Sequence, residues 1–350
     1  MQAYKQTILL FTAIVCFYCV DYQSYAQELL VPLNENSILK KNLGTKKANK
    51  KLKAAELVEL PFFDDFADSY YYPKQKLWTD SFAFINDSYP DLPPSIGAAT
   101  LDAIDEKGEF YPSAGYEMSF VADYLSSQPI NLNYPGNQTI YLSFYYQAQG
   151  LGDNPEEKDS LILEFYEPDA ETWNTVWKKE GTTNHYFEQE IFHINESKYL
   201  KEGFRFRFKN LASLSANNVP SRVGNVDHWH IDYILLDKDR NSSDLTHHDI
   251  AFVKPITSFL NDYQSMPWKH FLVNPASELK SNIEVSYKNN DNIDRLVERI
   301  DFVFIDNTSN LINDTLHGGS SDMIPDLIIN YTAPYSYPFV TNLRYILTGL

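Results

Sequence analysis

Residues 226–236 read Val226-Asp227-His228-Trp229-His230-Ile231-Asp232-Tyr233-Ile234-Leu235-Leu236. Aromatic and aliphatic side chains recur at every second position of this stretch. A period of two residues is typical of a β-strand with one buried face. The side chains expected on that buried face are Trp229, Ile231, Tyr233 and Leu235. The stretch therefore predicts a core strand of a β-sandwich, although it identifies no chemistry by itself.

Short strand-like segments separated by turn residues fill the chain before this stretch. Phe204, Phe206 and Phe208 alternate with basic residues, which indicates a half-buried strand. The expected strands are 57–66, 78–85, 96–104, 117–122, 139–148, 161–166, 175–179, 187–194, 203–209 and 228–236. Because no convincing helical period interrupts them, the pattern predicts an all-β jelly-roll sandwich over residues 56–240.

A polar stretch at 238–244 predicts a boundary, and a second, smaller β domain is expected over 245–350. Its expected strands are 249–255, 268–273, 281–287, 297–305 and 326–331. The chain ends inside an apolar, strand-like run, and an unfinished edge strand is prone to associate. We therefore expect this domain to be truncated, as part of a longer polypeptide or of an incomplete gene.

The amino-terminal residues 1–26 have the pattern of a cleaved signal peptide. An uncharged apolar run spans residues 7–20, and small residues precede an expected cut between Ala26 and Gln27. The run is short for a membrane span, which needs about 20 residues, so no transmembrane segment is expected in the mature chain. A lipid-modified Cys16 or Cys19 is the alternative, but bulky residues precede both. We expect a secreted protein or one on a bacterial outer surface.

Composition limits the partners and the compartment. Both cysteines lie within the signal peptide, so a mature chain without disulfides favours a bacterial envelope or surface protein. The net charge of −18 disfavours nucleic acid and anionic lipid as partners. Seven lysines crowd residues 40–53, within a leader or linker at 27–55. A basic arm for an acidic partner is one interpretation of them, and a solvated spacer is the other.

An ordered series of motifs resembles the MAM-type jelly roll, a relative of the concanavalin-like sandwich. The motifs are Pro61-Phe62-Phe63-Asp64-Asp65-Phe66, Leu77-Trp78-Thr79, Ile140-Tyr141-Leu142-Ser143-Phe144-Tyr145-Tyr146, the segment from Trp173 to Gly181, and Ile231-Asp232-Tyr233-Ile234. The paired cysteines of that family are missing, which implies a divergent bacterial module. Residues 63–66, 93–97 and 227–232 also resemble the N-terminal regions of large surface proteins of the type IX secretion system. Residues 245–350 resemble an immunoglobulin or fibronectin type III sandwich.

The resemblance to jelly rolls implies a structural cation, such as Ca²⁺, shared by an acid of the opening strand and an acid of the closing strand. Asp232 matches the closing position, and Asp64 or Asp65 the opening one. Calcium needs several oxygen ligands, some of them backbone carbonyls. Plain turn acids are the alternative. His228, His230 and Asp232 lie two residues apart on one strand, which also suits zinc, although a polar strand face is the simpler interpretation.

No catalytic motif is recognisable in the sequence. Glu188 and Glu190 have the spacing of a glycosidase acid pair, but they lack the third acid and the apolar neighbours of such sites. Tyrosines near expected loops are candidates for stacking on sugar rings. They are Tyr70, Tyr71, Tyr72, Tyr111 and Tyr116.

We therefore expect a non-catalytic adhesion or recognition protein that binds a polysaccharide or a surface protein. Two alternatives remain open at this point. The region is the accessory module of a secreted hydrolase whose catalytic domain lies beyond Leu350, or it is a structural component of an envelope secretion or motility apparatus.

Overall fold

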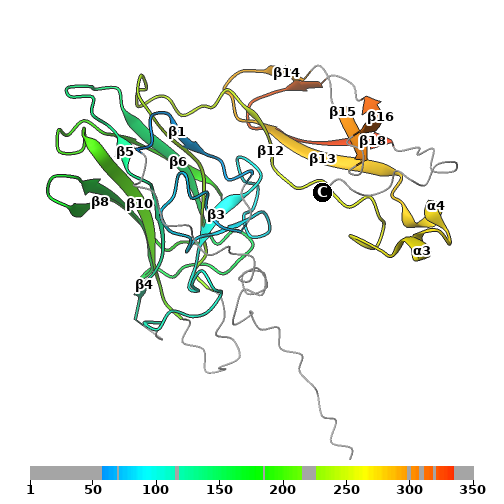
Figure 1. Cartoon of the computed structure of the whole chain (residues 1–350), viewed down its shortest axis with the longest axis horizontal. Coiled ribbons are helices and arrows are strands. Elements are labelled where there is room, and N and C mark those ends of the chain that lie inside the picture. Colours follow the sequence, from blue (N-terminus) through cyan, green and yellow to red (C-terminus); the bar gives the residue numbers. More distant parts are fainter. Residues whose placement is uncertain are drawn as a thin grey trace, which may run out of the picture.

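The structure is a computed structural model, and it describes residues 57–68, 71–114, 118–183, 186–214, 226–297, 301–306, 311–317 and 321–334. The expected signal peptide, leader and final apolar run lie outside these residues. The described chain is all-β, as expected: two main antiparallel sheets form a sandwich, and smaller sheets follow it (Figure 1). No helix among the described residues has the length and apolar character that crossing a membrane requires.

The first sheet of the sandwich is built around the strand that opened the sequence analysis. Its order is β2-β3-β11-β6-β9. The strand β1 also pairs with β11, along the same edge as β3. The strands are β1 (Phe62–Asp64), β2 (Phe84–Asn86), β3 (Ala98–Leu101), β6 (Tyr141–Ala148), β9 (Glu188–His193) and β11 (Trp229–Asp237). Since β1 and β3 pair with different ends of β11, a gap between them lies opposite Asp232 and Tyr233.

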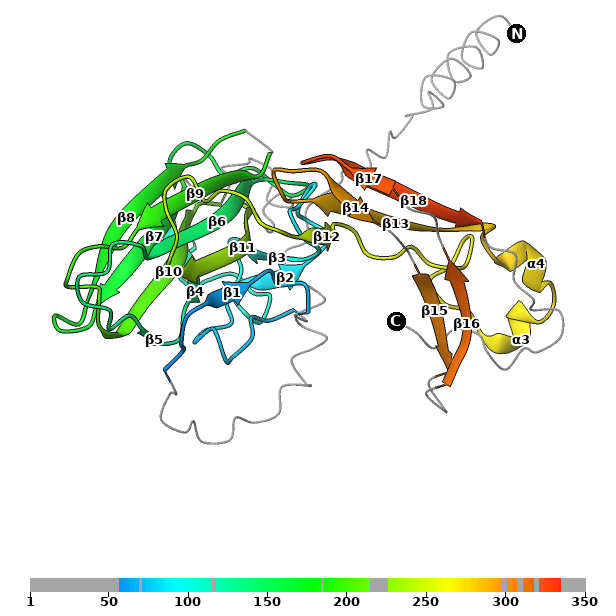
Figure 2. The same ribbon diagram turned by 90° about the horizontal axis from the view of Figure 1, so that it is seen from above.

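The second sheet has the order β4-β10-β7-β8, and β5 pairs with the start of β10. The strands are β4 (Phe120–Ser126), β5 (Ile130–Asn131), β7 (Ser160–Glu167), β8 (Thr172–Glu180) and β10 (Glu202–Ala212). Figure 2 shows β7, β8 and β10 on the side of the sandwich away from the second unit, and Figure 1 shows β8 and β10 there. The outer face of this sheet is therefore not covered by that unit.

A continuous aromatic and aliphatic core fills the space between the two sheets. The alternation predicted for β10 is confirmed, since Phe204, Phe206 and Phe208 are fully buried. The Phe206 ring meets Phe62 and Trp78 edge to face, with ring centroids 5.1 and 5.7 Å apart. These contacts join the opening strand to the opposite sheet, so burial of aromatic rings holds the sandwich together.

The predicted alternation along β11 is correct only for its first half. Register with β6 slips by one residue between Asp232 and Leu235, and Tyr233 has a φ of 51°. Such a β-bulge turns the following side chains to the opposite face. Ile234 and Leu236 therefore enter the core in place of Tyr233 and Leu235.

Tyr233 is buried on the outer side of its sheet, where the second unit begins. Its ring lies 4.2 Å from that of His247 between centroids, and its hydroxyl donates to Asp249 over 3.0 Å. Asn290 adds a further contact, because its side-chain amide donates to the carbonyl of Pro94 over 2.9 Å. Aromatic packing and hydrogen bonds thus connect the two units.

The second unit contains a three-stranded sheet β12-β13-β18 and the pairs β14–β17 and β15–β16. Its elements are β12 (Ile250–Phe252), α3 (Trp268–Phe271), α4 (Pro275–Glu278), β13 (Asn282–Asn289), β14 (Arg295–Val297), β15 (Asp301–Asp306), β16 (Leu311–His317), β17 (Ser321–Met323) and β18 (Ile328–Pro334). The strand expected at 268–273 is wrong: a helical turn follows Pro267, whose fixed φ suits a helix start. The immunoglobulin or fibronectin type III assignment stays a prediction.

Candidate functional site

The outer face of the second sheet carries basic residues where its inner face carries phenylalanines. On β10, Arg205, Arg207 and Lys209 alternate with the buried rings and are half-buried. Residues directly opposite each other on neighbouring strands share a face. The register therefore places Tyr166 beside Arg205 and Glu164 beside Arg207.

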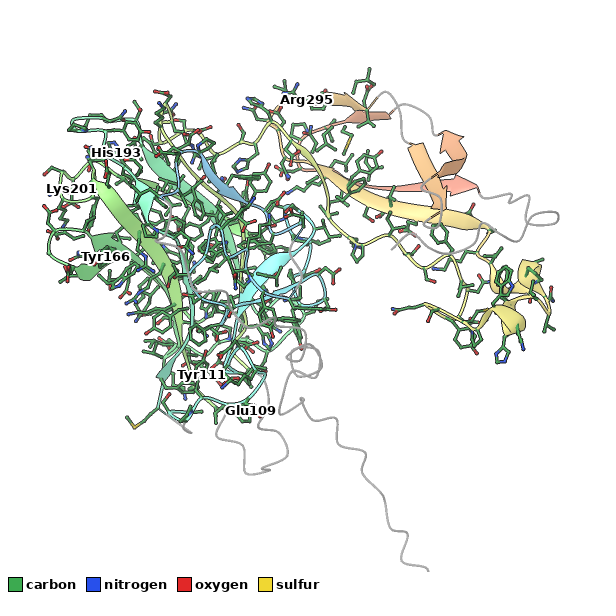
Figure 3. All side chains as sticks on the ribbon, viewed as in Figure 1. Glu109, Tyr111, Tyr166, His193, Lys201 and Arg295 are labelled. Carbon is green, nitrogen blue, oxygen red and sulfur yellow. The ribbon has the colours of Figure 1, made fainter. Side chains whose placement is uncertain are left out.

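Three aromatic rings lie on the same face and contact the guanidinium groups. Tyr166 is paired with Trp173 of β8, and their ring centroids are 5.2 Å apart. The Arg207 guanidinium carbon lies 4.1 Å from the Trp173 ring centroid and 4.9 Å from that of Tyr124. Arg205 also approaches Trp173, at 5.3 Å. We call Tyr124, Glu164, Tyr166, Trp173, Arg205 and Arg207 the outer aromatic face; Figure 3 labels Tyr166 at the side of the sandwich.

A buried carboxylate fixes the centre of the outer aromatic face. Glu164 is 5% exposed and accepts hydrogen bonds of 2.6 Å from both Arg207 Nε and Lys209 Nζ. Burial alone raises the pKa of Glu164, but the bonds from Lys209 and Arg207 outweigh it and hold that pKa below its usual value. Glu164 is therefore an ionised acceptor that orients Arg207.

Arg205 is held by the neighbouring segments. Its Nε donates to the Ser127 carbonyl and its Nη2 to the Thr79 hydroxyl, each over 3.0 Å. Close by, burial raises the pKa of Asp80 to about 6, although a backbone bond from Ser126 and the two arginines oppose the change. The face thus presents oriented planar donors beside aromatic rings. This combination suits a ligand with flat apolar faces and hydroxyl groups at its edges.

The tyrosines predicted to stack on sugars take part in internal packing where the structure describes them. Tyr71 stacks on Phe84 with 6.2 Å between ring centroids, and the Tyr72 hydroxyl donates to the Glu106 carbonyl. The Tyr111 hydroxyl donates to Asp123 over 2.5 Å, and burial raises the pKa of Tyr111. Tyr70 and Tyr116 lie outside the described residues.

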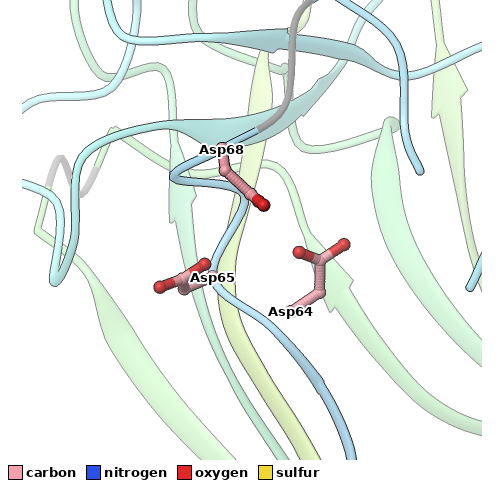
Figure 4. Close-up of side chains that lie close together, drawn as sticks. All are labelled: Asp64, Asp65 and Asp68. Atoms are coloured by element: carbon pink, nitrogen blue, oxygen red, sulfur yellow. The ribbon is translucent and has the colours of Figure 1, made fainter. Parts of the chain in front are cut away.

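The acids predicted to hold a cation on the opening strand lie together. Asp64, Asp65 and Asp68 place carboxylate oxygens within 4.8 Å of one another at the bend after β1 (Figure 4). The ammonium group of Lys74 forms ion pairs with both Asp64 and Asp68. Asp64 also accepts from the indole of Trp78 over 2.7 Å. Protein donors therefore already surround the buried Asp64.

Asp232 lies outside that group, in the gap between β1 and β3. Its carboxylate accepts from the backbone of Ser95 over 3.0 Å and from that of Tyr233 over 2.6 Å. The Ser95 hydroxyl links it to the backbone carbonyl of Asp65. Burial raises the pKa of Asp232 well above its usual range. A cation shared by Asp232 with Asp64 or Asp65 stays a prediction.

The zinc arrangement of His228, His230 and Asp232 is wrong, because their ligand atoms do not form a group within 4.8 Å of one another in the described residues. Both ring nitrogens of His230 have protein partners: Nδ1 lies 2.8 Å from the Thr100 hydroxyl, and Nε2 lies 3.1 Å from the Gln149 carbonyl. Burial lowers the pKa of His228 to about 4 and that of His230 to about 3. These histidines are therefore neutral, buried side chains rather than residues of an outer face.

Glu188 and Glu190 lie on β9, at the edge of the first sheet. Glu188 accepts from the Tyr146 hydroxyl over 2.6 Å and pairs with Lys179 at 3.2 Å. Burial raises the pKa of Glu190, and the charge of Lys179 opposes this change. Both carboxylates are thus engaged with neighbouring strands.

The aromatic residues of the outer face were not among the predicted sites. The alternation of Arg205, Arg207 and Lys209 signals an outward face of β10. However, only the strand register places Tyr124, Tyr166 and Trp173 on that face, because β4, the β7–β8 hairpin and β10 are separate segments of the sequence.

Comparisons with known proteins identify no family for this chain. No protein-family model matches the chain, and no curated protein matches it. A xylan-binding domain of carbohydrate-binding module family 22 matches at 10% identity, over 51% of this chain and 95% of its own, with a TM-score of 0.31. A family 27 module from Caldicellulosiruptor saccharolyticus, solved with mannohexaose, matches at 12% identity, over 52% and 98%, with a TM-score of 0.31.

An adhesin domain is also similar. The K3 cleaved adhesin domain of Lys-gingipain from Porphyromonas gingivalis W83 matches at 10% identity, over 41% of this chain and 75% of its own, with a TM-score of 0.24. At these values the likeness carries no conclusion about ligands. The specific resemblance to MAM-type and type IX secretion proteins stays a prediction.

Proposed function

We propose that this protein is a secreted or surface-exposed, non-catalytic recognition module that binds polysaccharide on its outer aromatic face. The observation that carries the proposal is the grouping of Tyr124, Tyr166 and Trp173 around oriented guanidinium groups, on a sheet face that the second unit does not cover in the described residues. Pyranose rings have an apolar face that stacks on aromatic rings, and their hydroxyls bond to planar donors and acceptors.

The net charge of the chain and the fixed positions of the arginine side chains support this choice of ligand. The net charge of −18 opposes binding to nucleic acid, which would be the other common ligand of an aromatic and arginine-rich face. Because Glu164 and the backbone near Ser127 hold the arginines, the face loses little conformational entropy when a ligand binds. A rigid face of this kind suits an extended, repetitive polymer.

Replacing Trp173 by alanine is expected to weaken polysaccharide binding about 30-fold, as for loss of an anchor that contributes about 2 kcal/mol. The measurement is retardation of the full-length protein in native gels containing xylan, β-mannan or polygalacturonate. Tyr263→Ala is the matched control, since Tyr263 is 57% exposed and lies in the second unit.

Two outcomes would contradict the proposal. If Trp173→Ala is retarded as strongly as the unaltered protein, the outer aromatic face does not bind the polysaccharide. Absence of retardation by every polysaccharide, together with saturable binding to a purified surface protein, would replace polysaccharide by a protein partner.

A further inference from the structure

A second group of acids lies in the sandwich, away from both the outer aromatic face and the bend after β1. Glu156 and Asp159 belong to the loop between β6 and β7, and Asp227 lies two residues before β11. Their carboxylate oxygens lie within 4.8 Å of one another. Asp159 and Asp227 are fully buried, whereas Glu156 is partly exposed and leaves an approach from solvent.

One oxygen in this group lacks a partner among the described residues. Asp227 Oδ2 accepts from the Ser213 backbone over 2.6 Å, but its fully buried Oδ1 has no hydrogen bond. A buried carboxylate oxygen without a donor is strongly unfavourable, so most such atoms in proteins have a partner or bind a cation. The residue also has a φ of 60°, in the left-handed region, so its backbone is held in an unusual conformation at this point.

Further oxygen atoms surround the three carboxylates. The Ser213 hydroxyl lies 2.8 Å from Asp159 Oδ2 and 3.3 Å from Glu156 Oε2. The carboxylate of Asp153 accepts from the backbone of Asp227, and its charge acts on the Asp227 carboxylate. The Ser213 hydroxyl oxygen therefore lies beside two of the three carboxylates.

The group also differs from the acids near β1, because no basic side chain of the described residues pairs with it. Lys74 pairs with Asp64 and Asp68, whereas no described lysine or arginine forms an ion pair with Glu156, Asp159 or Asp227. Burial, and then the charge of Asp159, raise the pKa of Asp227 to about 9. Hydrogen bonds from Ser213 reach Asp159 and Asp227, but no described cationic side chain offsets the repulsion between the carboxylates.

We propose that Glu156, Asp159 and Asp227 bind one Ca²⁺ ion, with the Ser213 hydroxyl as a neighbouring oxygen. Calcium binds six to eight oxygens at about 2.3–2.6 Å, so oxygens on opposite sides of the ion lie about 5 Å apart. Zinc prefers nitrogen and sulfur ligands, and Mg²⁺ usually keeps several waters, which a largely buried group of carboxylates does not favour.

The ion would connect three separate segments of the sandwich. It joins the loop between β6 and β7 to the end of β10 through Ser213 and to the start of β11 through Asp227. The loop already packs closely on Gly181, where a Cβ atom would lie 1.9 Å from the Glu156 carbonyl. Calcium would therefore stabilise the folded sandwich without contacting the outer aromatic face.

The test compares thermal unfolding of the EDTA-treated, full-length protein with and without added Ca²⁺, together with bound calcium measured by mass spectrometry after gel filtration. At a hundredfold excess over the dissociation constant, the melting temperature is expected to rise by about 5–10 °C. One bound ion should accompany that rise. Asp227→Asn is expected to abolish both, and to fold, because the amide has the shape of the carboxyl and brings no charge into the buried site.

Asp232→Asn is the matched control. Asp232 is an equally buried acid on β11, but it lies outside the group of Glu156, Asp159 and Asp227. It should keep the full response to Ca²⁺. Loss of the response in Asp232→Asn with retention in Asp227→Asn would overturn the proposal and favour the site shared with the opening strand. No bound ion and identical melting with and without Ca²⁺ would also overturn it.

Discussion

Replacing Phe206 by alanine is expected to lower the free energy of unfolding of the sandwich by about 3–5 kcal/mol. Phe206 is fully buried, and its ring meets Phe62, Trp78 and Phe208 edge to face. Alanine would remove these contacts and leave a cavity between the two sheets, where the strands restrict relaxation. Urea unfolding followed by near-ultraviolet circular dichroism measures the change.

Phe252→Ala is the control for this substitution. Phe252 lies on β12 and is 56% exposed, so its truncation should change the stability by less than about 0.5 kcal/mol. A loss below about 1 kcal/mol for Phe206→Ala would contradict the packing of the two sheets described here.

Replacing Asp64 by leucine is expected to cost about 3 kcal/mol of stability. Asp64 is 1% exposed and accepts hydrogen bonds from the Trp78 indole, the Phe66 backbone and Lys74. Leucine has a similar volume but cannot accept, so two buried N–H donors would lose their partner and the Lys74 ammonium group would keep only Asp68. Asp64→Asn keeps an acceptor oxygen and should cost about 1 kcal/mol.

The neighbouring Asp65 provides the comparison. Its carboxylate accepts only an exposed bond from the Ala67 backbone among the hydrogen bonds of the described residues. Asp65→Leu should therefore change the stability by less than about 0.5 kcal/mol in the same urea titration. Equal losses for the two leucine variants would show that Asp64 does not act through its buried acceptor role.

The fold class could be predicted from the sequence because the buried faces of β10 and of the first half of β11 leave a period-two pattern. The bulge at Tyr233 could not, since it depends on the pairing of β11 with β6 and on packing against His247. The strand expected at 268–273 failed because a short apolar run gives no period that separates helix from strand.

The candidate sites were less predictable than the fold. Asp64 and Asp65 lie together because they are adjacent in sequence, but the cation that either of them would share with Asp232 stays a prediction. The outer aromatic face depends on the register of four strands, and the group of Glu156, Asp159 and Asp227 joins positions about 70 residues apart in the chain. Neither arrangement can be predicted from the spacing of residues within one strand. His228 and His230 are neutral because they are buried, and their burial could not be predicted from the sequence either.

The indole N–H signals of tryptophan in a nitrogen-15 correlation spectrum test the proposed binding face most directly. A xylan or mannan oligosaccharide that retards the protein should shift the Trp173 signal. It should leave the buried Trp78 and Trp229 signals, and that of Trp268 in the second unit, in place. An oligosaccharide that saturates the protein while the Trp173 signal stays unchanged and the Trp268 signal moves would contradict the account.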